Sequence, residues 1–376
     1  MSDSIESAMK RRLSRRMDRG NLRSLNNLKG AIDFSSNDYL GLSRHPKVIS
    51  AVNDSLRDSG CLGSTASRLS SGNSHLATAI EKSIAAYHGA EGGLLFSSGY
   101  LANVGLMSSL LSQNDLCLYD ERIHMSMRDG IKLSKVRAHS LRHNDLSHLE
   151  ETLAKDDARG HKVVVIESVY SCCGSVAPLN EIVSLCDRYH ASLIIDEAHA
   201  TGVLGPQGRG LSNRFRSSPS LLATVHTLGK AIGVSGAIVL GSSLLKSFLL
   251  NFCNTQIYTT MLPYLSLHAI AGAYKVLPSM DCERDQLCNL IQYFKFKAGS
   301  LPLRLQQTMT PIQSILTDTK TSARELSHVI QQNGIDVRPM TFPTVPHGKD
   351  CLRICLHAYN TFEEIDLLLE TLMRHL

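Results

Sequence analysis

Short apolar runs alternate with longer stretches of helical spacing from about Ala77 onward. Two of these runs, Val163–Ile166 and Leu193–Ile195, are unbroken, as expected for strands buried on both faces of a sheet. Such alternation is typical of βαβ units in a doubly wound sheet. The pattern therefore predicts an α/β fold with a mostly parallel seven-stranded sheet flanked by helices. The expected strands are Leu94–Phe96, Cys117–Tyr119, Val136–His139, Val163–Glu167, Ser192–Asp196, Thr224–Leu228 and Ala237–Leu240.

The pattern changes after about Pro278, where shorter strand-like runs and a closing helix from Thr361 indicate a smaller α+β region. Its expected strands are Ile312–Leu316, Asp336–Pro339 and Leu352–Leu356. We therefore predict three parts. Residues 1–45 form an N-terminal helix and arm, residues 46–277 a large cofactor-binding domain, and residues 278–376 a small C-terminal domain.

Composition limits the class of protein. Of the 376 residues, 43% are hydrophobic and 19% are charged, which is ordinary for a soluble globular protein. No apolar run approaches the roughly 20 residues that cross a bilayer. We therefore expect a cytoplasmic protein without a membrane partner. The ten cysteines lack the paired spacing of metal ligands, which favours reduced thiols and no metal site.

The net charge of +5 comes largely from an N-terminal stretch that contains Lys10–Arg12, Arg15 and Arg16. The simplest interpretation is the solvated face of a helix, with Met9, Leu13 and Met17 packed inward. Nucleic-acid binding is disfavoured because aromatic residues do not interleave the charges. Docking of an acidic carrier protein or a phosphorylated thioester remains open.

Asp196 ends one of the buried strands, at the edge where doubly wound sheets place their chemistry. A buried carboxylate is costly unless a cation or a strong donor pairs with it. A protonated pyridine nitrogen, as in pyridoxal 5′-phosphate (PLP), is such a partner. The alternative is an N-cap that opens the next helix. His199, three residues later, would lie near the same ring, unless it is simply a packed histidine.

Lys230 follows another expected strand, in the string Thr227-Leu228-Gly229-Lys230. A lysine that forms a Schiff base must be partly desolvated so that its amine can be neutral. Gly229 would let the backbone approach closely, and Thr227 offers a hydroxyl to a phosphate. Alone, such a string is usually a surface turn. Its place downstream of Asp196 favours a cofactor lysine.

Ser98-Gly99-Tyr100 follows the first expected sheet strand and precedes a helix that we expect to begin near Leu101. Backbone N–H groups at a helix start bind anions, which suits the cofactor phosphate. The alternative is a simple connecting turn.

Together these strings resemble the α-oxoamine synthases, a family of fold-type-I PLP enzymes. The resemblance spans nearly the whole chain. The matching strings are Phe34–Leu42, Ser98–Tyr100 with Ala102-Asn103, His143–Asp145, Glu167–Ser171, Asp196–His199, Gly205–Gly210 and Thr227–Lys230.

The resemblance implies roles around the cofactor. His124 would stack on the ring and take part in proton transfer with Lys230. Ser171 and His199 would lie near the phenolic oxygen. The phosphate side would hold Ser98, Gly99, Tyr100 and Thr227, with Thr260 reaching it from the neighbouring subunit of a homodimer.

The resemblance also implies substrate-binding residues. Asn37 and Arg353 would lie on the side of the amino-acid carboxylate. Thr344 would line the acyl pocket, and Arg23 is a candidate for a substrate-reaching arginine.

The C-terminal strings Arg338-Pro339, Pro343–Pro346 and Leu352-Arg353 are most similar to family members that condense L-alanine with a pimeloyl thioester on the route to biotin. The implied reaction releases CO₂, with coenzyme A or an acyl carrier protein as thiol carrier. Two alternatives stay open. One is a glycine-using member, such as 2-amino-3-ketobutyrate ligase or 5-aminolevulinate synthase. The other is a non-catalytic partner subunit, which the presence of both Lys230 and Asp196 disfavours.

The chain departs from the family at three places. Ser171-Cys172-Cys173-Gly174 stands where the family has Ser-Met-Asp-Gly, which removes a carboxylate near the site. Tyr359-Asn360 replaces Ala-His, and Met340–Phe342 replaces Arg-Pro-Pro. These changes affect substrate detail and local rigidity rather than the cofactor residues.

Overall fold

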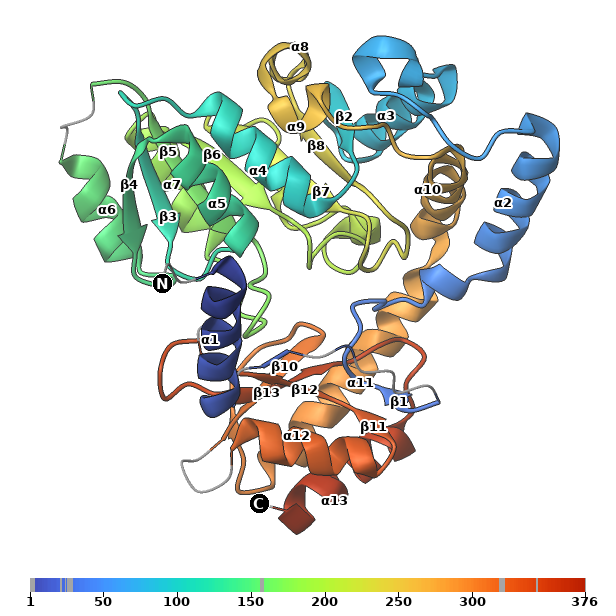
Figure 1. The fold of residues 1–376 in the computed structure, drawn as a ribbon, viewed down its shortest axis with the longest axis vertical. Helices are drawn as coiled ribbons and strands as arrows, with labels where there is room; N and C mark the ends of the chain where they lie inside the picture. Colours follow the sequence, from blue (N-terminus) through green and yellow to red (C-terminus); the bar gives the residue numbers. More distant parts are fainter. Residues whose placement is uncertain are drawn as a thin grey trace.

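The computed structural model describes residues 4–20, 22, 23, 25, 30–155, 159–317, 322–342 and 344–375. Its largest sheet has seven strands in the order β2-β8-β7-β6-β5-β3-β4 (Figure 1). The strands are β2 (Gly92–Phe96), β3 (Leu116–Asp120), β4 (Arg137–Leu141), β5 (Lys162–Glu167), β6 (Ser192–Asp196), β7 (Leu221–Thr227) and β8 (Ala237–Gly241). The predicted α/β fold with a mostly parallel seven-stranded sheet is confirmed.

Strand β8 is the exception to the parallel arrangement, because it runs antiparallel to both β7 and β2. The connection from β7 to β8, residues 228–236, is too short for the crossover that a parallel neighbour requires. The segment that contains Lys230 is therefore a tight loop at the carboxyl end of β7.

Helices cover both faces of this sheet. Strands β5 and β6 are almost completely buried, as their unbroken apolar runs predict. The helices of this part are α2 (Pro46–Ser59), α3 (His75–Tyr87), α4 (Gly99–Leu110), α5 (Met125–Ser134), α6 (Leu146–Ala154), α7 (Leu179–Arg188), α8 (Ser243–Phe252), α9 (Asn254–Ile257) and α10 (Tyr264–Val276). Short helical turns lie at Leu42–Arg44, Arg68–Gly72, Pro206–Gly208, Ser212–Phe215 and Leu277–Ser279.

A second, antiparallel sheet has the order β12-β13-β10-β9 and packs against three helices (Figure 1). Its strands are β9 (Arg304–Leu305), β10 (Ile312–Leu316), β12 (Arg338–Met340) and β13 (Cys351–Cys355). The helices are α11 (Asp281–Gly299), α12 (Ala323–Gln332) and α13 (Phe362–His375). The expected strand 336–339 is split. Ile335–Asp336 (β11) pairs elsewhere, and β12 is an edge strand, where Pro339 costs no ladder hydrogen bond.

The N-terminal arm joins this second sheet region rather than the large sheet. Strand β1 (Ile32–Asp33) pairs in parallel with β11. Beyond it, Phe34 O accepts a hydrogen bond from Cys355 N, at the end of β13. The arm therefore brings residues near position 37 toward the C-terminal strands. The three-part division at 45 and 277 stays a prediction.

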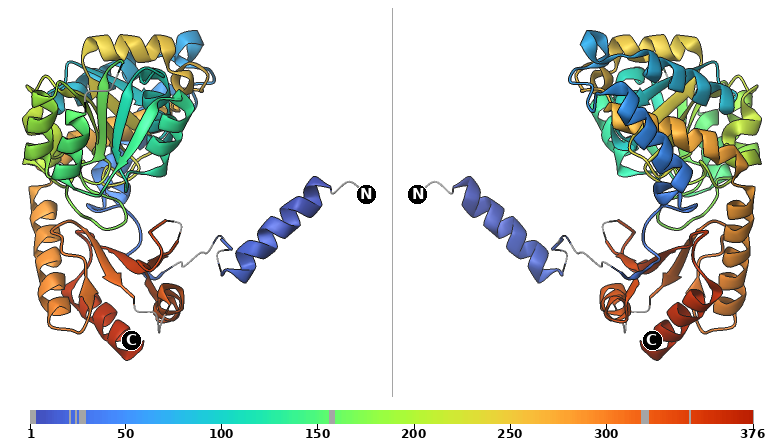
Figure 2. Two further views of the ribbon diagram at one scale, coloured as in Figure 1. Left: turned by 90° about the vertical axis from the view of Figure 1, so that its left-hand side faces the viewer. Right: turned by 90° about the vertical axis from the view of Figure 1, so that its right-hand side faces the viewer.

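The basic N-terminal segment forms helix α1 (Ile5–Asp18), with Ser4 as its N-cap. Its apolar stripe does not pack inward, because Met9, Leu13 and Met17 are each at least half exposed. Figure 2 shows why, since the helix stands away from the rest of the chain. The expected inward packing is therefore wrong for the single chain. Within the described residues, no helix has both the length and the apolar composition that crossing a membrane requires.

A buried ion cluster fixes strand β2. The Glu81 carboxylate is fully buried and accepts hydrogen bonds from Leu95 N at 2.8 Å, from Lys246 Nζ at 2.9 Å and from the Arg68 guanidinium. A buried carboxylate needs such partners to offset its lost hydration. The cluster ties β2 to α3 and α8, and so holds the end of β2, where Ser98 begins the next helix.

Candidate active site

Polar residues gather where the neighbouring strands β5, β6 and β7 of the large sheet have their carboxyl ends. Glu167, at the end of β5, is the register partner of Asp196, at the end of β6. Thr227 ends β7, the next strand in the sheet, and Lys230 follows in the tight loop. The sheet order therefore brings together side chains from separate parts of the sequence, as doubly wound folds do at their ligand sites.

The Lys230 amine lies 2.7 Å from His199 Nε2. Desolvation lowers the pKa of Lys230 to about 8, although the nearby carboxylates of Asp196 and Glu167 oppose that shift. Burial, reinforced by the charge on Lys230, holds the pKa of His199 well below its usual range. The histidine is therefore neutral and the lysine is close to the point at which its amine loses its proton.

A chain of hydrogen bonds runs from Lys230 to Arg353. His199 Nδ1 lies 2.7 Å from the Tyr39 hydroxyl, which donates to Asn37 Oδ1 at 3.1 Å. Because that hydroxyl donates to Asn37, it accepts from His199 Nδ1, which leaves Nε2 as an acceptor for the lysine. Arg353 Nη2 donates to the same Asn37 oxygen at 2.9 Å.

Arg353 is buried on β13. Its Nε donates to the Ser171 carbonyl at 2.7 Å, and the described residues provide no carboxylate that forms an ion pair with it. Arginines on strands often form ion pairs with nearby acids, but this structural role finds no support for Arg353 among the described residues. One of its donors is available for an incoming carboxylate, which a guanidinium can bind bidentately.

A second hydrogen-bond chain runs from Asp196 to His124. Asn103 Nδ2 donates to Asp196 Oδ2 at 2.7 Å and to Ser126 Oγ at 3.0 Å. The Ser126 hydroxyl lies 2.7 Å from His124 Nδ1, which also accepts from Ser126 N. With Nδ1 accepting, the neutral ring carries its proton on Nε2. Burial lowers the pKa of His124, the charge of Asp196 acts against that shift, and the charge of Lys230 adds to it.

Asp196 is not the N-cap of a helix. Its other oxygen accepts from Ala198 N at 2.8 Å, but a series of turns follows it in place of a helix. No ion pair holds this buried carboxylate within the described chain. Asp196 is therefore a buried carboxylate that lacks an ion-paired cation, and a ligand with a cationic group could fill that place.

Glu167 is the second buried carboxylate of the site. Burial, and then the charge of Asp196, raise its pKa, while Lys230 acts in the opposite direction. One of its oxygens accepts from Ser171 N at 3.1 Å, and the other has no hydrogen-bond partner among the described residues. Ser171 thus contacts both Glu167 and Arg353 through its backbone.

A helix does begin where the sequence predicted an anion site, at the start of α4. Ser98 is the N-cap, so the helix begins at Gly99, two residues earlier than expected. A Cβ on Gly99 would lie only 1.9 Å from Thr227 Oγ1. The helix start and the Thr227 hydroxyl therefore face one another closely, which only glycine permits. By contrast, a Cβ on Gly229 would make an ordinary contact at 3.8 Å.

Tyr100 and Thr260 lie at the rim of this region. The Tyr100 ring is about half exposed, and its hydroxyl donates to Asp129 on α5. Thr260 is exposed, and its carbonyl accepts from Ser97 Oγ at 3.3 Å, beside the start of α4. The role of Thr260 toward a neighbouring subunit stays a prediction.

The structure does not bring Arg23 and Thr344 into the cluster. Both are exposed, and no contact among the described residues links either to Lys230 or Arg353. Pro343, in the same expected string, lies outside the described residues. The roles of Arg23 and Thr344 therefore stay predictions without structural support.

Four contributors had no role assigned from the sequence: Tyr39, Asn103, Ser126 and Glu167. Two carried a signal. Glu167 ends an unbroken apolar strand, and Asn103 lies one turn into the helix that follows Gly99. Tyr39 lies in the matching string Phe34–Leu42, but only its contact with His199 shows what it does, and Ser126 gave no sign of a site before its partners were placed.

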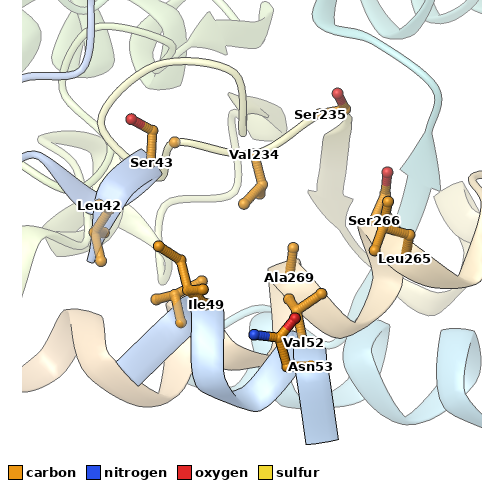
Figure 3. Close-up of a pocket in the computed structure, with 12 residues that line it drawn as sticks. Leu42, Ser43, Ile49, Val52, Asn53, Val234, Ser235, Leu265, Ser266 and Ala269 are labelled. Atoms are coloured by element: carbon orange, nitrogen blue, oxygen red, sulfur yellow. The ribbon is translucent and has the colours of Figure 1, made fainter. Parts of the chain in front are cut away.

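A separate apolar cavity of about 290 Å³ lies between α2, α10 and the loop after Lys230 (Figure 3). Val48, Val52, Val234 and Ala269 are among its lining residues. It adjoins the reactive cluster through the loop but contains none of the cluster's titratable side chains.

The comparisons with known proteins agree with this geometry. Residues 29–372 match the family described as aminotransferase class I and II. The chain belongs to the class I and II aminotransferase family. It is 38% identical to an 8-amino-7-oxononanoate synthase of Emericella nidulans, over 98% of this chain and 95% of that protein. This relative and others of the same name confirm the resemblance to α-oxoamine synthases.

Solved structures of this aminotransferase family confirm the fold-type-I arrangement. The 8-amino-7-oxononanoate synthase of Francisella tularensis is 32% identical, with a TM-score of 0.79 over 92% of this chain and 97% of that chain. A structure of SPT with PLP is 26% identical, with a TM-score of 0.86 over 92% of this chain and 87% of that chain.

The cofactor of this chain is PLP. Its chemical groups fit the residues on the sheet edge. Lys230 supplies a partly desolvated amine, Asp196 a buried carboxylate without a cation, and the Gly99 turn an open helix start. PLP has an aldehyde, a basic ring nitrogen and a phosphate to match these three features.

Substitution Gly99→Ala tests the phosphate end of the site. The added Cβ must displace Thr227 or the start of α4, so we expect PLP affinity to fall by about tenfold or more, the effect of one lost charge-assisted hydrogen bond. Titration of the apoprotein with PLP, followed by absorbance, measures the affinity. Gly299→Ala is the control, since a Cβ there meets nothing within 4 Å. Equal affinity in both variants would contradict the assignment.

Proposed function

We propose that this protein condenses L-alanine with a pimeloyl thioester, carried on coenzyme A or an acyl carrier protein, to give 8-amino-7-oxononanoate, CO₂ and the free thiol in biotin biosynthesis. Relatives named for this product support the reaction. The observation that carries the proposal is the hydrogen-bond chain from Lys230 to Arg353. It places an amine that can move a proton near a guanidinium that can hold a carboxylate.

The residues at the carboxyl ends of the strands would each have a separate role in cofactor binding and proton transfer. When bound, PLP supplies an electron sink that weakens the Cα–H bond of the amino acid. Lys230 would anchor the cofactor and, once released, remove the Cα proton, because its lowered pKa makes a neutral amine accessible near neutral pH. Asp196 would keep a proton on the ring nitrogen, and Asn103 would hold Asp196 in place. His124 would stack on the ring and share the proton transfers.

The substrate side would be formed by the N-terminal arm and β13. Arg353 and Asn37 would bind the carboxylate of alanine, and Tyr39 would keep His199 oriented toward the lysine. Before the condensation, this contact would fix which bond of the amino acid faces Lys230. After it, the same carboxylate would leave as CO₂.

We also propose a homodimer with the site at its interface. Large apolar side chains are exposed near Thr260, among them Leu62, Leu69 and Tyr258, and a second copy of the chain would cover them. Thr260 would then reach the partner's phosphate site. The cytoplasmic location expected from the sequence stays a prediction.

The decisive test is product analysis by mass spectrometry. The purified protein is given alanine, glycine or serine together with acyl thioesters of several chain lengths on coenzyme A and on acyl carrier protein. We expect 8-amino-7-oxononanoate from alanine and the pimeloyl thioester. Faster turnover of glycine would assign the chain to a glycine-using synthase. Bound PLP with no product from any pair would indicate a non-catalytic partner subunit.

Borohydride reduction tests Lys230. We expect PLP to be fixed on the peptide that contains Lys230, and no fixed PLP in Lys230→Ala. The adduct in apoprotein should form faster as the pH rises through about 8 and then level off, because the amine is neutral above its lowered pKa. An ordinary lysine would continue to gain reactivity up to about pH 10. Peptide mapping of PLP to another lysine would overturn the assignment.

Substitution Asp196→Asn separates the cofactor role from a backbone-capping role. The amide oxygen can still accept from Ala198 N, so the fold should persist. A neutral amide cannot hold the ring nitrogen protonated, so we expect exchange of the alanine Cα–H in D₂O to slow by about tenfold or more. Proton NMR measures the exchange. An unchanged rate would favour the capping role, for which asparagine is also suited.

Arg353→Ala tests the carboxylate contact. We expect the KM for alanine to rise and kcat/KM to fall by roughly tenfold or more, while PLP binding persists. Arg353→Lys should be intermediate, because lysine keeps the charge but not the bidentate geometry. Arg188→Ala is the control, since Arg188 is exposed and pairs with Glu150 at the surface. Steady-state kinetics with alanine identical to those of the control would exclude this role.

A further inference from the structure

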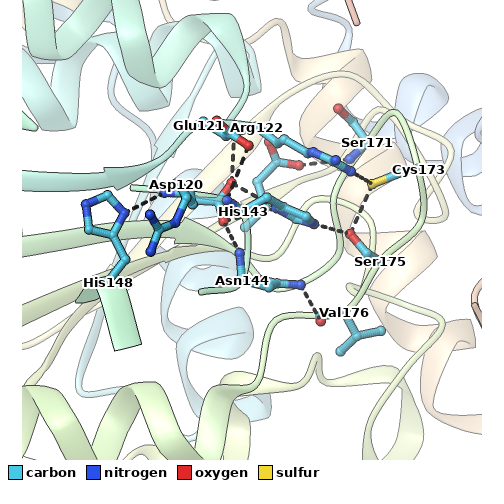
Figure 4. A network of polar contacts seen from close by, with 12 residues as sticks. Asp120, Glu121, Arg122, His143, Asn144, His148, Ser171, Cys173, Ser175 and Val176 are labelled. Carbon is cyan, nitrogen blue, oxygen red and sulfur yellow. Dashed lines mark hydrogen bonds and ion pairs between the residues drawn. The ribbon is translucent and has the colours of Figure 1, made fainter. Parts of the chain in front are cut away.

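A second polar cluster surrounds the turn that follows β5 and contains none of the residues assigned to the cofactor (Figure 4). Cys173 Sγ is 3.0 Å from Ser175 Oγ and accepts from Arg122 Nη1 at 3.4 Å. Ser175 Oγ is 2.8 Å from His143 Nε2, and His143 Nδ1 lies 3.0 Å from Asp120. A thiol is thus connected, through a hydroxyl, to a histidine that a carboxylate orients.

The cluster is held by packing from three sides. Asp120 ends β3, His143 follows β4, and the turn 171–175 follows β5. Gly174 has a positive φ of 68°, and its carbonyl accepts from the hydroxyls of Thr308 and Thr310. A Cβ on Gly174 would lie 2.2 Å from Ile312 O. The turn therefore cannot move freely away from the histidine.

The charges around Cys173 favour its ionised form. Burial alone would raise the pKa of the thiol, but hydrogen bonds from His143, Ser175 and Arg122 outweigh it and lower the pKa to about 6. Burial acts to lower the pKa of His143, but its contact with Asp120 raises that pKa to about 8. Elsewhere, burial raises the pKa values of Cys117 and Cys186 to about 12. Near pH 7 the pair is therefore a thiolate beside an imidazolium.

The other ionisable groups facing Cys173 do not cancel this effect. Tyr170 lies edge-on to the His143 ring at 4.4 Å, and burial raises its pKa well above the usual range. Cys172 and Cys351 also have raised pKa values, first because of burial. These groups are neutral near pH 7, and burial raises the pKa of Glu167 to about 8, so the charged neighbours that remain are Arg122, His143 and Asp120.

A small space adjoins the cluster on the Asp120 side. It measures about 20 Å³, enough for one water-sized polar molecule, and is lined by Asp120, Asn144 and Tyr170 among others. Asn144 Oδ1 is buried and has no hydrogen-bond partner among the described residues. This space touches the cluster at Asp120 and is not lined by Cys173, so a peroxide would approach the sulfur through its small exposed surface, 7% of the residue.

We propose that Cys173 is a modification site whose sulfur is oxidised by small hydroperoxides, with His143 as the proton donor. The sulfur attacks one peroxide oxygen, and an S–O bond forms as the O–O bond breaks. Sulfur loses two electrons, and the peroxide is reduced by two. The leaving oxygen takes the proton of His143 and departs as water or an alcohol, which leaves a sulfenic acid on Cys173.

The turn links this site to the substrate side. Ser171, two residues before Cys173, accepts from Arg353 Nε and donates to Glu167. An added oxygen on the sulfur must displace Ser175 or Arg122, and the clamped turn will transmit that shift to Ser171. Resting on the proposed function, we expect oxidation to raise the KM for alanine and to leave PLP bound.

The experiment treats the PLP-loaded protein with hydrogen peroxide, traps sulfenic acid with dimedone, and locates the label by peptide mass spectrometry. We expect label on Cys173 at a rate that falls below about pH 6, where the thiolate is lost, and falls again above about pH 8, where His143 loses the proton that it donates. The exposed Cys61, Cys282 and Cys288 are internal comparators, labelled in the same sample at each pH. A Cys173 rate that follows theirs, or no label at all, overturns the proposal.

Three variants separate reactivity from folding. Cys173→Asp keeps an anion between Arg122 and His143, so it should stay active and become insensitive to peroxide. Cys172→Ser should still be labelled at Cys173. His143→Gln should slow labelling and move its midpoint up by about one pH unit or more. If His143→Gln labels like the parent, the proton-donor role fails. If alanine KM is unchanged after Cys173 is fully oxidised, the link to Arg353 fails, while a failed condensation assay would leave the labelling result intact.

Discussion

Lys230, Asp196 and Glu167 lie in one water-poor space, and the energies of their charges depend on one another. Desolvation lowers the pKa of the lysine and raises that of Glu167, while attraction between them acts against both shifts. The arrangement is costly for the protein alone, because Asp196 is buried without an ion-paired cation in the described chain. A cofactor that brings a cationic nitrogen relieves that cost, so much of the surrounding structure makes sense as support for this balance.

The support comes from neutral hydrogen-bonding groups rather than from further charges. Asn103 holds Asp196, and Tyr39 holds His199. Because these partners carry no charge, they fix geometry without altering the balance between the lysine and the two carboxylates. His199 is also neutral, because burial lowers its pKa strongly and the charge of Lys230 lowers it further.

The sequence was sufficient to predict the sheet and to place Lys230 and Asp196 where its strands end. Parallel strands give unbroken apolar runs, and functional residues in such sheets lie just beyond those runs. It was insufficient for contacts between distant segments. Tyr39 and His199 are 160 positions apart, and no local pattern connects them. The packing of α1 was wrongly expected, since an amphipathic pattern shows that a helix has an apolar face but not which chain covers it. The antiparallel direction of β8 could have been inferred from the sequence, because the gap between the expected strands ending at Leu228 and beginning at Ala237 is too short for a parallel crossover.

The contact between Asn37 and Arg353 has a consequence for how the protein is made. The two residues are 316 positions apart, and β1 and β11 bring their segments together. A ribosome emits the chain from the N-terminus, so the large sheet and Lys230 are complete well before β13 has left the exit tunnel. The arm must wait, unpaired, until the last strands appear. The residues around Lys230 can therefore come together earlier in synthesis than the substrate side, which cannot form until β13 has been made.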